Sequence, residues 1–127
     1  MKRVIIAGAL AFASAALTMA PTASATAAAY KNCEYPRVCF YLTDSDWNNS
    51  APSAAYQDVT SSYQTLGTYS RGSNWVLNTR NDDRAYLRYT VNSTGATRYV
   101  CLPPGNQIPF SSAYTVTGIR IDTASTC

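Results

Sequence analysis

The fold class is decided by residues 85–102, which read AYLRYTVNSTGATRYVCL. In residues 85–91, apolar and polar side chains alternate, which predicts a strand with one face in a core. The polar residues 92–95 then supply turn chemistry, and residues 97–102 follow as a second β-prone run. We therefore predict a β-hairpin over this stretch.

Two runs before the hairpin also predict strands. In residues 37–42, the apolar side chains of Val38, Phe40 and Leu42 share one side, which we expect to face the core. Residues 74–78 (NWVLN) form a second candidate. Residues 54–66 fit neither a strand nor a helical turn well, and the sequence leaves this segment undecided.

The last run, residues 114–121, changes the phase of its alternation. Val116 lies at an even position, whereas Ile119 and Ile121 lie at odd ones, with Gly118 between them. A β-bulge at Gly118 would place all three on one face. Short β-prone runs separated by Asn, Asp, Ser, Gly and Pro clusters are typical of an all-β sandwich or barrel. No segment has a helical stripe.

The N-terminus has the three parts of a secretory signal peptide. Lys2 and Arg3 precede an apolar run, and small residues follow it. The apolar run is shorter than the roughly 20 residues that a membrane-spanning helix needs. We predict a signal over residues 1–25, cleaved after Ala25, with Ala20 and Ala29 as alternative positions. Residues 26–127 are then one secreted domain, which we expect to be a monomer.

Four cysteines, in an exported chain of this size, predict two disulfides. They allow three pairings, and the sequence alone does not choose among them. We favour Cys33 with Cys39 and Cys101 with Cys127. The chain-entropy model gives these bridges about 2.4 and about 3.6 kcal/mol, so the longer loop contributes more. A zinc site is disfavoured, because there is no paired C-x2-C and no histidine.

The charge balance argues against polyanionic partners. The chain has ten basic and seven acidic residues, and without Lys2 and Arg3 the basic count falls to eight. No run of Lys or Arg offers the clustered footprint that phosphate backbones need. We therefore expect no nucleic-acid partner, and no membrane binding once the signal is removed.

The absence of histidine removes most catalytic mechanisms. Catalytic triads, the HExxH zinc helix and the usual proton shuttle near neutral pH all require it. A glycosidase built on two carboxylates is the enzyme class that survives. Its candidates, and those for a calcium loop, lie in polar clusters where Asp ordinarily caps turns. We expect no enzymatic activity, no metal and no cofactor. The candidate carboxylates are Asp44, Asp46, Asp58, Asp82 and Asp83.

The chain has ten tyrosines and two tryptophans. Tyr and Trp give binding surfaces a large contact area at low entropy cost. Tyr is also a favoured strand residue, so a tyrosine such as Tyr86 fits equally well as cover for a solvent-facing strand. The composition leaves both interpretations open.

Two segments resemble a known family. Residues 33–47 run from C-x5-C-F-Y to Trp47, and residues 116–121 read VTGIRI. Both are similar to strands of the βγ-crystallin Greek key, and in particular to the secreted actinobacterial proteins of peptidase inhibitor family I36. The resemblance implies a Greek-key βγ-crystallin-like sandwich. Asn49 stands where the family has glycine, and we expect it to adopt a positive φ.

The same resemblance implies a site. Residues 98–102 (RYVCL) are similar to the segment that carries the reactive bond in an inhibitor of this family. Cys101-Leu102 would then be the bond offered to a metalloprotease, with Leu102 entering an apolar pocket of the enzyme. Pro103 and Pro104 would stiffen the segment and lower the entropy cost of docking. The implied inhibitory loop is Val100, Cys101, Leu102, Pro103 and Pro104.

The expected function is therefore inhibition of an extracellular protease by binding. An antifungal or cell-wall polysaccharide-binding protein is the first alternative, since that class also uses secreted folds of this kind. A small α-amylase inhibitor is the second, although the Trp-Arg-Tyr triplet of that family is absent.

Overall fold

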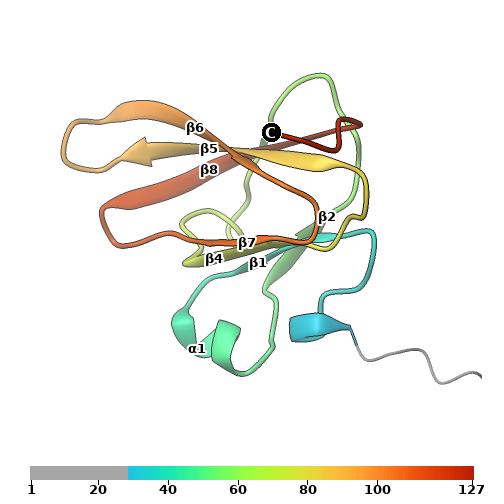
Figure 1. Cartoon of the computed structure of the whole chain (residues 1–127). Coiled ribbons are helices and arrows are strands. Elements are labelled where there is room, and N and C mark those ends of the chain that lie inside the picture. Colours follow the sequence, from blue (N-terminus) through green and yellow to red (C-terminus); the bar gives the residue numbers. More distant parts are fainter. Residues whose placement is uncertain (1–28) are drawn as a thin grey trace, which may run out of the picture.

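The computed structural model describes residues 29–127. The predicted signal segment, residues 1–25, lies outside them. The described chain is an all-β sandwich of two antiparallel sheets, as predicted (Figure 1). In chain order the elements are a 3-10 helix Tyr30–Asn32, β1 Val38–Tyr41, α1 Asp44–Asn48, β2 Ala54–Tyr56, β3 Gln64–Thr65, β4 Trp75–Asn78, β5 Arg84–Val91, β6 Ala96–Leu102, β7 Gln107–Pro109 and β8 Tyr114–Asp122.

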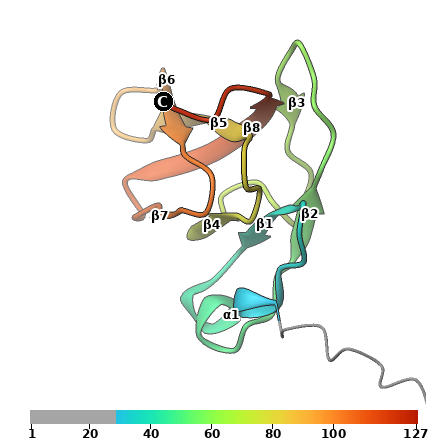
Figure 2. The ribbon, with the colours of Figure 1, turned by 45° about the vertical axis from the view of Figure 1, so that its right-hand side comes forward.

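The two sheets are interlocked. Sheet A has the strand order β2-β1-β4-β7, and sheet B has the order β3-β8-β5-β6. Strands β1 to β4 and β5 to β8 form two successive units of four. The third strand of each unit pairs in the sheet of the other unit: β3 pairs with β8, and β7 pairs with β4. Figures 1 and 2 show the two sheets packed face to face, with the chain crossing between them.

The predicted hairpin is confirmed. β5 and β6 pair without interruption from Ala85–Leu102 to Val91–Ala96, and residues 92–95 form the connecting turn. Gly95 has a φ of 71°, a conformation that a residue with a side chain adopts only at a cost. Ala85 and Leu87 are fully buried, as the alternation predicts.

The main core lies between the sheets. The longer strands present their alternate apolar side chains to this space, and Leu66 and Phe110 enter it from just beyond β3 and β7. The buried members are Val38, Phe40, Leu66, Val76, Ala85, Leu87, Leu102, Phe110, Val116, Ile119 and Ile121.

Sheet A is covered on its other face as well. All four residues of β1 are buried, not only Val38 and Phe40. Tyr41 packs edge-on against Trp47 of α1, and Trp47 stacks on Trp75 with ring centroids 4.5 Å apart. The prediction that one face of this strand would carry the apolar set is therefore incomplete, because α1 and the N-terminal segment form a third layer below sheet A (Figure 1).

Helix α1 was not predicted. A capping box begins it: Thr43 Oγ1 accepts from the Asp46 backbone N–H at 3.0 Å, and Asp46 Oδ2 accepts from the Thr43 N–H at 3.1 Å. The prediction of a positive φ at Asn49 is wrong, since its φ is −88° and the next residue, Ser50, has a φ of 53°. Asn49 caps the helix, and left-handed residues ordinarily follow the cap.

The predicted bulge in β8 is present. Arg88 pairs with Gly118 and Tyr89 with Val116, so Thr117 is the extra residue. Val116, Ile119 and Ile121 are all buried as a result. The undecided residues 54–66 contain two short strands, β2 and β3, and Val59 forms an isolated bridge with Ile121 between them.

The two favoured disulfides are both present, Cys33–Cys39 and Cys101–Cys127. The first ties the N-terminal segment to β1, and the second ties the C-terminus to β6. Over residues 29–127, no helix has the length and apolar character needed to cross a membrane.

Candidate functional site

The implied inhibitory loop is divided by the structure between a strand and a turn. Val100, Cys101 and Leu102 belong to β6, the edge strand of sheet B. Leu102 is 2% exposed and packs in the main core. Its side chain therefore does not reach an enzyme pocket while the protein is folded. Pro103 and Pro104 are half-buried and open the turn that leads to β7.

Residues 103–106 form a tight turn whose tip is exposed. The Asn106 N–H donates to the Pro103 carbonyl at 3.3 Å, and Gly105, between them, has a φ of 70°. Proline at the second position and a left-handed glycine at the third are the residues of a type II turn. The Asn106 side chain also donates to the Pro104 carbonyl at 2.9 Å. The turn is thus closed by its own residues.

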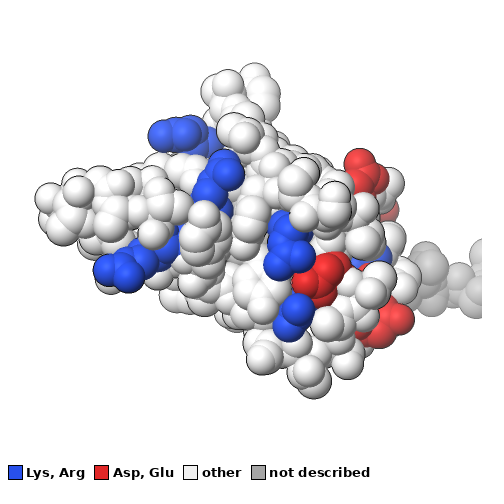
Figure 3. Space-filling view, turned by 90° about the horizontal axis from the view of Figure 1, so that it is seen from above, with Lys and Arg blue, Asp and Glu red and all other residues white. Residues whose placement is uncertain are grey.

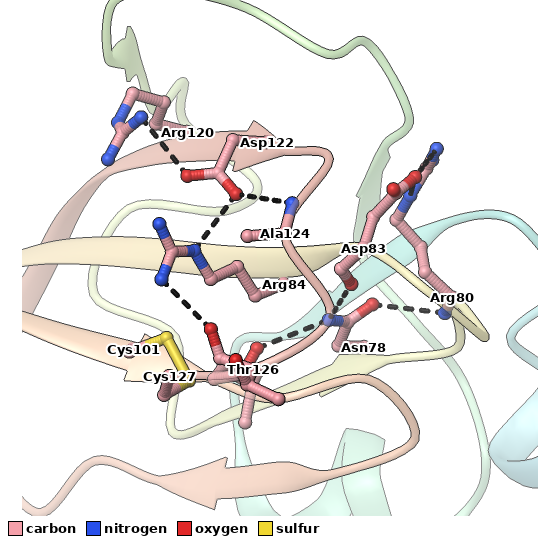
Figure 4. A network of polar contacts seen from close by, with 11 residues as sticks. Asn78, Arg80, Asp83, Arg84, Cys101, Arg120, Asp122, Ala124, Thr126 and Cys127 are labelled. Atoms are coloured by element: carbon pink, nitrogen blue, oxygen red, sulfur yellow. Dashed lines mark hydrogen bonds and ion pairs between the residues drawn. A yellow bond between two sulfur atoms is a disulfide. The ribbon is translucent and has the colours of Figure 1, made fainter.

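The side chain of Asn78 contacts the start of this turn, and Figure 4 shows its hydrogen bonds with Asp83 and Arg80. Asn78 is fully buried at the end of β4. The two N–H groups of its amide Nδ2 are shared among three carbonyl oxygens, and its Oδ1 accepts from the Arg80 N–H at 3.0 Å. Its backbone N–H donates to the Asn106 carbonyl at 2.9 Å. The three carbonyls belong to Asp83 at 3.1 Å, Leu102 at 3.3 Å and Pro103 at 3.4 Å.

The C-terminus is fixed beside β6. Besides the Cys101–Cys127 bridge, Arg84 donates to the Thr126 carbonyl at 2.9 Å and to Asp122 Oδ1 at 2.9 Å (Figure 4). The hydrogen bond from Arg84 lowers the pKa of Asp122 below its ordinary value, and the Ala124 N–H and Arg120 act in the same direction. The last residues are therefore held by a disulfide and by a hydrogen bond from Arg84, which Asp122 keeps in place through an ion pair.

We expect the Asp122 contacts to make stability depend on pH in the acid range. Because the pKa of Asp122 is lower in the folded state, its contribution is complete above the ordinary Asp pKa and is lost as the pH falls through the folded value. The check is urea unfolding across acid pH for the wild type and Asp122→Asn. The difference in unfolding free energy between them should shrink as the pH falls. A constant difference would contradict this assignment.

A groove lies beside the turn. It has a volume of about 860 Å³, and its lining includes Tyr30, Tyr35, Thr79 and Gly105. Tyr30 and Tyr35 are 57% and 60% exposed, so their rings are available to a partner. We call the turn 103–106 together with Tyr30, Tyr35 and Thr79 the turn face.

Three of the five candidate carboxylates have structural contacts. Asp46 completes the cap of α1, and Asp44 accepts a hydrogen bond from Trp75 Nε1 at 3.1 Å. Asp83 forms an ion pair with Arg80. Asp82 and the remaining candidate, Asp58, are exposed. Within residues 29–127, no three His, Cys, Asp or Glu side chains gather as a group that could hold a metal.

A second set of polar side chains lies on the outer face of sheet B, and the sequence did not indicate it. Arginines and tyrosines alternate there through close contacts of guanidinium groups with rings. Tyr86, for which the sequence left open both a binding role and cover of a solvent-facing strand, lies within this set. We call it the arginine–tyrosine row, and its members are Arg84, Tyr86, Arg120, Tyr63 and Arg88.

Comparisons of the chain with protein-family models, with curated proteins and with solved structures return no match. The chain's own residues define two surface features. One is the turn face, whose turn is closed by its own hydrogen bonds and supported by a buried asparagine. The other is the arginine–tyrosine row on the opposite side of the core from sheet A.

Proposed function

We propose that the chain is a secreted protein that inhibits an extracellular protease by binding it, and that the turn face is its contact surface. One observation carries this proposal: an exposed turn is closed by its own hydrogen bonds and also held by a buried side chain. Asn78 contacts the turn through both its backbone and its amide. Two disulfides are compatible with an extracellular location.

A rigid turn favours inhibition because it lowers the cost of binding. A flexible segment loses conformational entropy when a protein partner orders it, whereas a preorganised one has little left to lose. Pro103 and Pro104 restrict the backbone, and the Cys101–Cys127 bridge fixes the strand that leads into the turn. The turn is therefore prepared to enter a complementary cleft without rearrangement.

The aromatic residues of the turn face support a protein partner. Tyr30 and Tyr35 expose more than half of their surface beside Gly105. Tyrosine is enriched among the residues that dominate binding energy at protein interfaces. Together with the turn, these rings provide a contact area that a short loop alone would lack.

The strand topology supports the family resemblance. The exchange of β3 and β7 between the two sheets is consistent with two interlocked Greek-key motifs. A βγ-crystallin-like protein of the I36 type is consistent with that exchange and with the bulge at Thr117. The proposed target of inhibition, a thermolysin-like metalloprotease, is inferred from this resemblance.

The experiment is a titration of secreted proteases with the mature protein. The panel contains metalloproteases, serine proteases and an α-amylase. We expect stoichiometric inhibition of a thermolysin-like enzyme, with a Kd of about 1 µM or below. Asn106→Glu combined with Gln107→Glu should weaken inhibition about tenfold or more, since it introduces charge at two exposed positions, one within the turn face and one next to it.

The matched control is Ser61→Glu with Ser62→Glu. It adds the same charge at two exposed positions of the loop before β3. Inhibition by this control should equal that of the wild type, and both variants should keep the wild-type Tm within a few degrees. The proposal fails if no protease is inhibited, or if the two double variants inhibit equally well.

A further inference from the structure

The arginine–tyrosine row is assembled from three parts of the chain. Arg84, Tyr86 and Arg88 are alternate residues of β5 and therefore share its outer face. Arg120 of β8 pairs with Tyr86, and Tyr63 comes from the segment just before β3. Each ring has two guanidiniums over it: Arg84 and Arg120 lie 4.8 Å from the Tyr86 centroid, and Arg88 and Arg120 lie 5.6 Å from the Tyr63 centroid.

The face has an excess of positive charge that the whole domain lacks. Residues 29–127 contain eight basic and seven acidic residues. Three of the basic residues but only one acidic residue, Asp122, lie on the outer face of sheet B. Figure 3 views the molecule from this side and shows basic side chains along the face, with the acidic ones in its right-hand half.

Gly118 and the bulge position Arg88 within the row. A Cβ atom at Gly118 would clash with the Arg88 guanidinium at 2.8 Å. The guanidinium can therefore lie over the sheet here only because residue 118 has no side chain. Thr117 holds it there, since Arg88 donates to its Oγ1 and to its carbonyl oxygen, each at 3.2 Å. The bulge therefore fixes Arg88 on the outer face and also keeps Val116, Ile119 and Ile121 in the core.

The contacts leave several guanidinium N–H groups unused, whereas the rings of Tyr63 and Tyr86 lie beneath guanidiniums; the exposed ring on this face is that of Tyr99, beside Tyr63. Arg88 uses two of its five N–H groups in hydrogen bonds with Thr117, and Arg120 uses one with Asp122. Burial raises the pKa of Tyr63, so its phenol stays protonated at neutral pH. Because guanidiniums cover Tyr63 and Tyr86, neither ring offers a free face for a nucleic-acid base to stack on. The row therefore presents a line of fixed N–H groups that can donate to oxyanions.

We propose that the arginine–tyrosine row binds an acidic polysaccharide, with carboxylates along the polymer accepting from Arg84, Arg88 and Arg120. Guanidinium forks match carboxylates in geometry, and stacking on rings fixes the forks before the ligand arrives. This ligand is separate from the protease of the proposed function. The protein would thereby be retained on a carboxylated glycan while the turn face stays free.

A polysaccharide fits this face better than a protein does. Stable protein interfaces have an apolar centre from which water is excluded. The side chains that surround the row on this face are hydroxyl-bearing, aromatic or disulfide-bonded, and no aliphatic side chain is among them. They are Thr90, Thr97, Tyr99, Cys101, Thr115 and Thr117. A flexible polar polymer can follow such a surface without needing an apolar anchor.

The experiment is calorimetric titration of the mature protein with polygalacturonate at low salt. We expect binding that weakens as salt is added, because salt screens exposed charges. Fully methyl-esterified polygalacturonate, which keeps the sugar rings and loses the charge, should not bind. Oligothymidylate and polyphosphate, tested under the same conditions, should bind more weakly than polygalacturonate.

Arg88→Gln with Arg120→Gln should weaken binding about tenfold or more, since each loses charged hydrogen bonds. The matched control, Arg71→Gln with Arg98→Gln, removes the same charge at exposed positions outside the row and should bind like the wild type. Protease inhibition should be unchanged in both, so failure of this proposal is distinguishable from failure of the inhibitor proposal.

The NMR spectrum of the wild-type protein gives a readout that does not depend on the folding of any variant. Addition of tetragalacturonate should shift the amide signals of β5 and β8 around Tyr86, Arg88 and Arg120. Shifts confined to other parts of the molecule would overturn the proposal. So would equal binding of the esterified polymer, tighter binding of oligothymidylate or polyphosphate, or equal loss of affinity in the two double variants.

Discussion

Replacing Asn78 with alanine is expected to lower the free energy of unfolding by about 3 kcal/mol or more, since each buried polar group left without a partner costs about 1–3 kcal/mol. The substitution removes Nδ2 as a donor to the Asp83 and Leu102 carbonyls and Oδ1 as the acceptor for the Arg80 N–H, whereas the Pro103 carbonyl keeps its hydrogen bond from the Asn106 N–H. Asn78 is fully buried, so water does not readily replace these bonds. Equilibrium urea unfolding measures the loss.

Asn78→Asp separates shape from hydrogen bonding. It keeps the size of the side chain but has no N–H to donate, and its charge faces the three carbonyl oxygens. It should therefore destabilise the protein at least as much as alanine does. The control is Asn49→Ala, at an exposed position, which should cost no more than about 0.5 kcal/mol. Equal losses for Asn78→Ala and Asn49→Ala would show that the Asn78 contacts do not support the turn.

Leu102 is the second position with a large expected effect. Leu102→Ala removes a core side chain that is 2% exposed and should destabilise the protein by about 2–5 kcal/mol. Leu102→Met conserves the volume and should cost less than about 1.5 kcal/mol. Leu102→Asp places an unpaired charge in the core and should prevent folding. Thermal and urea unfolding of the three variants provide the check.

These variants also distinguish a core residue from a contact residue. If the Leu102 side chain entered a protease pocket, Leu102→Ala would weaken inhibition while leaving the unfolding free energy unchanged. We expect Leu102→Ala to lower the unfolding free energy and to leave inhibition unchanged at temperatures where the variant remains folded. A loss of inhibition in Leu102→Asp would reflect unfolding and would not locate the contact surface.

Local pattern was enough to predict the central hairpin and the bulge. The alternation in residues 85–91 follows from one face being buried, and the phase change around Gly118 follows from one inserted residue, Thr117. Both depend on neighbours along the chain. The favoured disulfide pairing is also confirmed, although the sequence did not exclude the other two pairings.

Features that depend on the third layer and on strand pairing were not predictable in the same way. β1 is buried on both faces only because α1 packs against it, and α1 is too short to show a helical stripe. Its one local signal is the capping residue Thr43 with Asp46 three positions later.

The two surface features depend on long-range pairing as well. Tyr63, Arg88 and Arg120 are far apart in the chain and meet only through the register of β5 with β8 and of β3 with β8. The sequence was expected to have no cluster of basic residues because it has no run of Lys or Arg. Pairing across strands brings three arginines together without such a run. Asn78 gave no sign of its role, because a strand-terminal asparagine is ordinarily a turn residue.

The turn face is proposed to contact the protease directly. Hydrogen exchange of the mature protein, alone and bound to an enzyme that it inhibits, tests this most directly. We predict slower exchange at Gly105, Asn106 and Tyr35 in the complex, and unchanged exchange in the hairpin turn 92–95. Inhibition of the enzyme without any slowing of exchange at the turn face would show that the protease is contacted elsewhere.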